Sequence, residues 1–320
     1  MLRRRKRARA WGRVVAVVLA SGAANTSEAR AQDLASLTCG LEAGPDRAVA
    51  AVLDGETVKL DDGKNVRLVG ALSPRAGDVG AVRGAWPPEE ATRTALAELL
   101  VGRTVALAFA GRREDRYGRV LAHLFLHDGE NKVWVQAQLV ERGLARASTS
   151  PGAEACIAHL VERENAARLA GRGLWANGAY AVRPADRPTE LRRYQGRWVL
   201  VRGAVEAVSG TQSLVLVDLV STEGPAVNEA HSSRPRRTRI TWRRSIERSL
   251  ALGGPARTLV GRDVLVRGWV ELRSGAPEIE ILTPGQIEVT SRPDRRADKP
   301  EPASTENEKR PGHEPPGVDQ

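Results

Sequence analysis

Three things are scarce in this 320-residue chain: aromatic side chains, cysteines and long apolar runs. Aromatic residues make up only 4% of the sequence, whereas glycine occurs 31 times and proline 18 times. This composition argues against a long helical bundle and favours a turn-rich chain of short strands. The length suffices for two domains plus tails, because a domain typically takes about 100 to 200 residues.

The apolar run at residues 14–24 is too short for the roughly 20 residues of a membrane-spanning helix. It follows the basic segment 3–7 and precedes Ala29-Arg30-Ala31, a small-x-small pattern. This order is typical of an export signal. We therefore predict a signal peptide over residues 1–31, a periplasmic or secreted protein, and no membrane span once the signal is removed. A disordered basic tail is the alternative, and it accounts poorly for the apolar run.

Only two cysteines are present, Cys39 and Cys156, separated by 117 positions. An oxidising compartment would let this pair persist as a disulfide. The chain-entropy model gives such a bond roughly 4 to 5 kcal/mol of stabilisation as an upper figure. Two unpaired thiols, one of them buried on a helix, are the alternative that the sequence leaves open.

Most of the net charge of +10 belongs to the predicted signal peptide. Residues 1–31 carry eight arginines and lysines against Glu28, which leaves only +3 for the rest of the chain. The mature protein is therefore mildly basic, and an argument for nucleic-acid binding must rest on local patches.

Alternating and periodic apolar patterns predict a small five-stranded barrel carrying three helices in the first half of the chain. Two prolines and two acids at residues 87–90 suit the first turn of one helix. Ser150 and Pro151 could begin another. Strands are expected over 48–53, 57–60, 66–69, 104–110 and 120–126, and helices from 87, over 133–142 and from about 150 to 171.

Beyond a polar linker at 181–195, the sequence partly repeats itself. Residues 196–203 recur as residues 261–268, and we interpret the two copies as equivalent strands rather than as two domains. Further short strands over 213–219, 238–242 and 286–289 predict a second small, OB-like β-barrel over 196–290. The overall class is thus α+β, mainly β. Residues 291–320 have almost no apolar content, which predicts a disordered tail.

Three segments of the first half carry recognisable chemistry. They are Asp54-Gly55-Glu56-Thr57, Arg67-Leu68-Val69-Gly70-Ala71-Leu72-Ser73-Pro74-Arg75 and Asp115-Arg116-Tyr117-Gly118-Arg119. They resemble Asp-Gly-Asp-Thr, Arg-Leu-x-Gly-Ile-Asp-Ala-Pro-Glu and Asp-Lys-Tyr-Gly-Arg of the staphylococcal nuclease (thermonuclease) family. Gly143-Leu144-Ala145 and Gly173-Leu174-Trp175 follow in the family's order. Coincidence among glycine-rich turns is the alternative.

The resemblance covers about residues 46–176 and implies an OB-type barrel for the domain over 32–180. It also implies that Arg67 and Arg119 bind the phosphate, a role that suits the planar guanidinium because it can meet two oxygens at once. Ordinary salt bridges to nearby carboxylates are the alternative for both arginines.

The catalytic carboxylates of the family are missing. Glu56 and the carbonyl of Thr57 remain at the metal position, but Leu72 stands where a second carboxylate ligand belongs, so we expect weak calcium binding at most. Arg75 occupies the position of the glutamate that prepares the attacking water. A guanidinium stays protonated and cannot act as a general base.

These substitutions favour binding over hydrolysis. Arg75 adds a third positive charge beside Arg67 and Arg119, and Tyr117 remains as an aromatic contact. We expect an exported thermonuclease-like protein that binds nucleic acid or another phosphate-bearing polymer, with calcium-dependent hydrolysis lost or weak. The alternatives are an active metal-dependent nuclease with a rearranged site and an envelope scaffold for a protein partner of unknown identity.

The second domain offers a basic patch of its own. Arg239, Trp242 and Arg243 are candidate ligand contacts, because an OB-type barrel holds single strands in a charged groove with an aromatic platform. Arg234, Arg236, Arg237 and Arg244 lie close to them in the sequence. The alternative is a half-buried edge strand with Ile240 and Trp242 inward. The stretches 268–269, 277–280 and 286–288 are similar to OB-like modules found beside bacterial nuclease-like domains.

Overall fold

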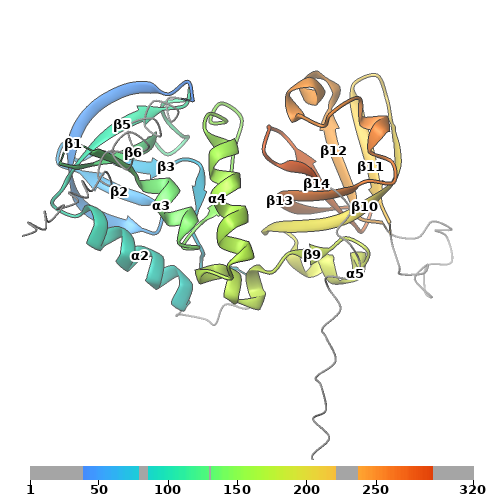
Figure 1. Cartoon of the computed structure of the whole chain (residues 1–320), viewed down its shortest axis with the longest axis horizontal. Coiled ribbons are helices and arrows are strands. Elements are labelled where there is room, and N and C mark those ends of the chain that lie inside the picture. The colour runs from blue at the N-terminus through green and yellow to red at the C-terminus, as the bar shows by residue number, and fades with distance from the viewer. Residues whose placement is uncertain (1–38, 79–85, 130, 221–236, 291–320) are drawn as a thin grey trace, which may run out of the picture. The chain divides into compact units, whose positions relative to one another are not determined.

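The computed structural model describes residues 39–78, 86–129, 131–220 and 237–290 (Figure 1). The predicted signal peptide and tail, together with Arg234 and Arg236, lie outside the described residues. Within the described ranges, no helix has the length and apolar character needed to cross a membrane. The described residues form two compact units, one of residues 39–76, 86–129 and 131–175 and the other of residues 77–78, 176–220 and 237–290.

The first unit is built on a closed five-stranded barrel (Figure 1). Around the barrel the strands follow the order β1-β2-β3-β6-β5, and the parallel pairing of β3 with β6 completes the ring. This is the predicted OB-type barrel. The strands are β1 (Glu42–Asp54), β2 (Thr57–Leu60), β3 (Asn65–Leu68), β5 (Thr104–Phe109) and β6 (Val120–Asp128), with β7 (Asn131–Trp134) added beside β6 and a separate pair of β4 (Ala71–Leu72) with β8 (Arg146–Ala147).

Three helices accompany this barrel, as the sequence predicts: α2 (Pro87–Leu100), α3 (Val135–Glu141) and α4 (Ile157–Leu169). Two boundaries differ from the expectation. Residues 131–134 pair with β6, so α3 begins only at Val135. Cys156 has a left-handed φ of 64°, which a helix cannot contain, so α4 begins after it and not near Ser150.

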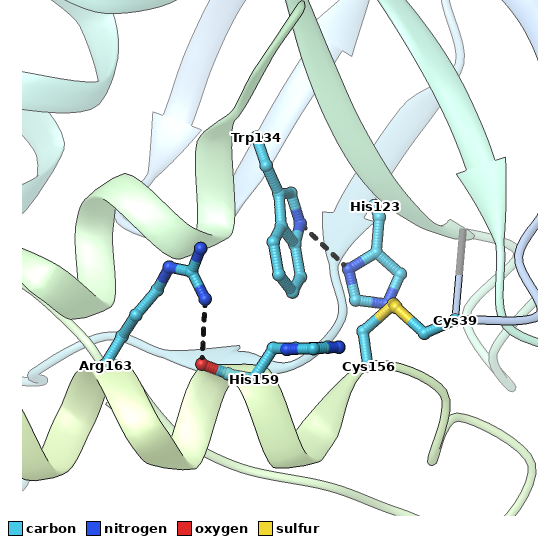
Figure 2. The surroundings of a disulfide bond; sticks show 6 residues. All are labelled: Cys39, His123, Trp134, Cys156, His159 and Arg163. Carbon is cyan, nitrogen blue, oxygen red and sulfur yellow. Dashed lines mark hydrogen bonds between the residues drawn. A yellow bond between two sulfur atoms is a disulfide. The ribbon is translucent and has the colours of Figure 1, made fainter. Parts of the chain in front are cut away.

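A disulfide between Cys39 and Cys156 confirms the predicted pairing, with the two Cα atoms 5.3 Å apart. It lies close to the buried pair His123 and Trp134 (Figure 2). The indole Nε1 of Trp134 donates a hydrogen bond of 3.2 Å to Nδ1 of His123. Burial lowers the pKa of His123 to about 4, so this imidazole is neutral near pH 7.

The second unit contains another closed five-stranded barrel, in the order β10-β11-β12-β14-β13 with β13 pairing back to β10. Position by position, this circular order is the same as in the first barrel, including one parallel pair, β12 with β14. The predicted second OB-like barrel is therefore present. Its strands are β10 (Trp198–Gly210), β11 (Leu214–Leu219), β12 (Arg239–Arg243), β13 (Asp263–Arg273) and β14 (Ala276–Ile281), with β9 (Arg183–Pro184) and β15 (Ile287–Thr290) at the margins.

The repeated sequence segments fall on β10 and β13, which are antiparallel neighbours. Their equivalent glycines, Gly203 and Gly268, each lie where another group approaches closely. A Cβ on Gly203 would lie 2.5 Å from the Cβ of Ala185, and one on Gly268 would lie 2.5 Å from a methyl carbon of Ile279. The repeat therefore marks two strands of one barrel whose packing needs glycine at the same place.

The predicted linker at 181–195 is wrong, because this segment is part of the second unit. Its strand β9 pairs in parallel with β10, and α5 (Pro188–Leu191) and the 3₁₀ turn η3 (Arg192–Tyr194) follow. Leu191 and Tyr194 are buried in the core of the second barrel. Few apolar residues occur here, but these two are buried, so composition alone gave the wrong answer.

Candidate functional site

The candidate site is built around Glu56, which the turn between β1 and β2 holds inside the first barrel. Its backbone N–H donates to Oδ1 of Asp54 at 2.8 Å, and its carbonyl accepts from the N–H of Leu68 at 2.8 Å. A Cβ on the preceding Gly55 would lie only 2.8 Å from the Cβ of Ser73. Glycine at position 55 lets the turn approach Ser73, and Glu56 is 3% exposed as a result.

Two arginines share the carboxylate of Glu56. Nη1 of Arg67 donates to Oε1 at 2.8 Å, and Nη2 of Arg75 donates to the same oxygen. The backbone N–H of Ser73 donates to Oε2 at 3.4 Å. The side chain of Arg75 is 46% exposed, whereas that of Arg67 is 23% exposed. One buried acid thus accepts hydrogen bonds from two guanidinium groups.

Arg119 is positioned by Asp115 within the turn before β6. Nε and Nη2 of Arg119 donate to Oδ2 of Asp115 at 2.8 and 2.7 Å. Oδ1 accepts from the backbone N–H groups of Tyr117 and Arg119. Burial raises the pKa of Asp115, but these hydrogen bonds and the charge of Arg119 outweigh it, so the pKa lies below its usual value. Tyr117 is 69% exposed.

The parallel pairing of β3 with β6 brings the two arginine segments to neighbouring strands. Val66 lies opposite Val120 and Arg67 lies opposite Leu121. The predicted site residues Glu56, Arg67, Arg75 and Arg119 therefore all belong to adjoining parts of one barrel. Both arginines of the predicted phosphate pair are also in salt bridges, as the alternative interpretation expected.

The residues at the predicted metal position do not fit a calcium ion. Leu72 is buried in β4 opposite Arg146 of β8 and brings no side-chain oxygen. Glu56 already accepts from two guanidinium groups, whereas calcium requires six to eight oxygen ligands. In the described part of the chain, no group of three or more His, Cys, Asp or Glu side chains is arranged to hold a metal. The Oγ1 of Thr57 is buried and has no hydrogen-bond partner among the described residues.

Residues 65–177 match the family model described as "Staphylococcal nuclease homologue". The first unit therefore contains a staphylococcal nuclease-like domain. A protein of Escherichia coli named "Uncharacterized endonuclease" is 28% identical over 129 residues, which cover 40% of this chain and 76% of that protein. A protein of the same name from Escherichia coli O157:H7 matches with the same identity and coverage.

In the second unit, the structure contradicts one predicted ligand contact. Trp242 is fully buried in the barrel core, so it is not a stacking platform. The alternative, with Ile240 and Trp242 inward, describes the strand correctly, although β12 lies between β11 and β14 and is not an edge strand. Arg239 is paired with Asp218 at 2.7 Å, and Arg243 is exposed at the end of the strand.

Sequence reasoning missed Asp115 as the residue that positions Arg119 in the nuclease-like domain. A signal for it exists, because an aspartate at the start of a turn often accepts from the backbone two residues later. It also missed the amide of Ser73 on Glu56. No sequence pattern marks that contact, because it joins residues 17 positions apart through the folded barrel.

Proposed function

We propose that the nuclease-like domain binds nucleic acid through its phosphates without a metal, and that calcium-dependent hydrolysis is lost or weak. We further propose that the protein acts after export, in the periplasm or outside the cell, because residues 1–31 have the pattern of a signal peptide.

The contact of Arg75 with Glu56 is the observation that carries this proposal. It places a fixed positive charge on the carboxylate that a metal would need. A guanidinium stays protonated near neutral pH, and unlike a metal ion it cannot leave the site, because it is part of the chain. The site therefore keeps this positive charge near neutral pH. Phosphate binding then needs no metal to offset the carboxylate.

The exposure of Arg75 supports an exchange of partners on binding. Its side chain is 46% exposed, so an incoming phosphate can reach it while Arg67 stays on Glu56. Phosphate is a good competitor for this guanidinium because it accepts two parallel hydrogen bonds. Arg119, which directly precedes the strand next to that of Arg67 and is held by Asp115, offers a further guanidinium group.

The same residues argue against hydrolysis by the family's route. Activation of water needs a group that accepts a proton, and Arg75 stands at the family's position for that group. Asp54 accepts from the backbone of Glu56, and Glu56 accepts from two arginines, so both nearby acids already have partners. Loss of a general base alone typically costs a factor of about 100 to 10,000 in rate.

A second candidate function is an active metal-dependent endonuclease with a rearranged site. The Oγ1 of Thr57 favours it, because this buried oxygen next to Glu56 has no hydrogen-bond partner in the described part of the chain and could take a ligand. The name of the Escherichia coli relatives, which calls them endonucleases, points the same way.

A paired binding and cleavage assay separates these functions. Protein beginning at residue 32 would be mixed with labelled DNA and RNA in chelator, in calcium and in manganese. We expect binding in chelator that weakens steeply with salt, and no cleavage. Arg67→Ala with Arg119→Ala should weaken binding at least tenfold, whereas Arg93→Ala, an exposed arginine paired with Glu90 on α2, should not.

Metal-dependent cleavage that the Arg67→Ala and Arg119→Ala changes abolish would overturn the binding proposal in favour of the enzyme. Binding to a protein partner with no dependence on salt would instead support the scaffold alternative. Leu72→Asp combined with Arg75→Glu tests the same point from the other side. We expect this double variant to bind calcium and to gain cleavage, because it restores both missing carboxylates.

A further inference from the structure

The second barrel has an exposed tryptophan, Trp269, which lies outside β12, the strand of the predicted ligand contacts. Trp269 of β13 is 47% exposed, although its cross-strand partner Trp198 of β10 is only 4% exposed. The two rings meet edge to face, with centroids 5.7 Å apart. Trp269 therefore presents indole surface to solvent while Trp198 supports it from one side.

A hollow of about 450 Å³ adjoins this indole. It is lined by Gln195, Gly196 and the β13 segment from Trp269 to Arg273. Its backbone is fixed, because the N–H of Gly196 donates to the carbonyl of Val270 at 2.8 Å and the N–H of Val270 donates to the carbonyl of Arg197 at 3.0 Å. The volume lies within the range of about 300 to 1,000 Å³ that is usual for small-molecule sites.

Two arginines close in the chain to the lining residues favour an anionic ligand. Glu271 and Arg273 in the lining form an ion pair of 2.9 Å and cancel each other. Arg193 and Arg197 flank the lining residues Gln195 and Gly196 in the chain and are both exposed. Within the described ranges, neither guanidinium takes part in an ion pair or a side-chain hydrogen bond. Two arginines without an ion-pair partner among the described residues therefore lie close in the chain to residues that line the hollow.

We propose that the hollow beside Trp269 is a second nucleic-acid site, which stacks an unpaired base on the indole and neutralises the adjoining phosphates with Arg193 and Arg197. A stacking aromatic with arginines beside it is the usual way to hold a single strand without regard to sequence. The site lies on β13 and the segment before β10, not on the β11–β12 face, where Trp242 is buried and Arg239 is paired with Asp218. It goes beyond the function proposed for the first unit.

The test measures binding of single-stranded and duplex DNA to the protein that begins at residue 32. For a labelled single strand of about 16 nucleotides, Trp269→Ala should weaken binding roughly tenfold, since stacking is worth about 1 to 3 kcal/mol per base. Trp269→Phe should retain most of the affinity, and duplex binding should change little. Leu282→Ala is the matched control, because Leu282 is an exposed apolar residue of the same unit.

The arginines have a separate readout. Arg193→Ala with Arg197→Ala should lower the slope of log affinity against log salt by about 1.4, because each phosphate contact on a single strand contributes about 0.7. Melting curves and circular dichroism would confirm that each variant is folded.

Two results would overturn this second site. One is unchanged single-strand binding by a folded Trp269→Ala protein. This result would mean that the hollow does not bind nucleic acid and takes a peptide or another ligand instead. The other is an equal loss for single strand and duplex, which would exclude stacking of an unpaired base. Trp269→Ala would also be measured in the protein that carries Arg67→Ala and Arg119→Ala, so that binding at the two sites can be distinguished. If those changes have no effect, the first unit's proposed function fails, while the effect of Trp269→Ala still decides the second site.

Discussion

Glu56 is the central residue of the candidate site, because Arg67 and Arg75 both donate to its Oε1. A carboxylate that is 3% exposed costs several kcal/mol to bury unless it is paired. The two arginines supply that pairing. The acid therefore competes with any phosphate for the same donors.

Glu56→Gln should strengthen binding of nucleic acid in the absence of metal. The amide keeps an oxygen that can accept from Arg67, but it removes the negative charge that competes with phosphate. We expect a several-fold tighter affinity and a steeper salt dependence in a fluorescence-anisotropy titration. Glu90→Gln on the exposed face of α2 is the matched control. Weaker binding by a folded Glu56→Gln protein would contradict the exchange of partners described for Arg75.

His123 makes the first unit sensitive to acid. Its pKa is lowered by burial to about 4 in the folded chain, whereas an unfolded histidine titrates near 6.5. The unfolded state thus binds the proton first, so stability is fully present above about pH 6.5 and is lost as the pH falls toward 4. Such a shift of the His123 pKa corresponds to a loss of about 3 kcal/mol in the free energy of unfolding at low pH.

Denaturant unfolding of the first unit at about pH 7 and about pH 4.5 measures this effect. The His123→Gln protein should lose less stability between these pH values than the unaltered protein does, because its side chain does not titrate. His159, which is only partly buried on α4, offers the control change His159→Gln. An unchanged pH dependence in His123→Gln would assign the acid sensitivity to other groups.

At the scale of elements, strands were easier to predict than their roles in the barrel. The alternation around 238–242 located β12 correctly, but the sequence could not say that this strand has neighbours on both sides. The sequence therefore left Trp242 as a candidate ligand contact. In the structure, strands lie on both sides of β12 and the Trp242 side chain is fully buried. The exposure of a strand residue depends on which distant strands pair with its own strand. A local sequence pattern does not reveal that pairing.

Strand β13 also carries an arginine that sequence reasoning did not single out. The side chain of Arg267 is fully buried, and it donates to Oε1 of Glu288 on β15 at 2.6 Å and to the carbonyl of Gly285. Glu288→Ala would leave a charge in the barrel without its carboxylate. We expect the second unit to lose about 3 kcal/mol or more, the usual cost of breaking a buried ion pair.

The control is Glu271→Ala, which breaks the exposed pair with Arg273 on the same strand. An exposed pair is worth at most about 1 kcal/mol. Both values would come from denaturant unfolding of the second unit. Equal effects of the two changes would show that Arg267 does not depend on Glu288.

At the scale of the whole molecule, alternating strand patterns predicted both barrels, and motif spacing selected the residues of the candidate site. Gly55, Arg67 and Arg119 could be placed because each lies in a short segment with a fixed turn or strand around it. The salt bridges of Glu56 and the packing of residues 183–194 against the second core could not be predicted. They join segments that only the folded chain brings together. The exposed face of Trp269 escaped prediction for the same reason.

The Cys39–Cys156 disulfide closes a loop of 117 residues that contains nearly all of the first barrel. By the chain-entropy model, such a long loop restricts the unfolded chain strongly, so the bond contributes up to about 4 to 5 kcal/mol. Cys39→Ser with Cys156→Ser should therefore lower the unfolding free energy of the first unit by several kcal/mol and leave the second unit's transition in place. Reduction of the unaltered protein should reproduce the loss, and reduction of the double variant should add nothing. A loss below about 1 kcal/mol would mean that the unfolded chain is already compact, so that the crosslink removes little of its entropy.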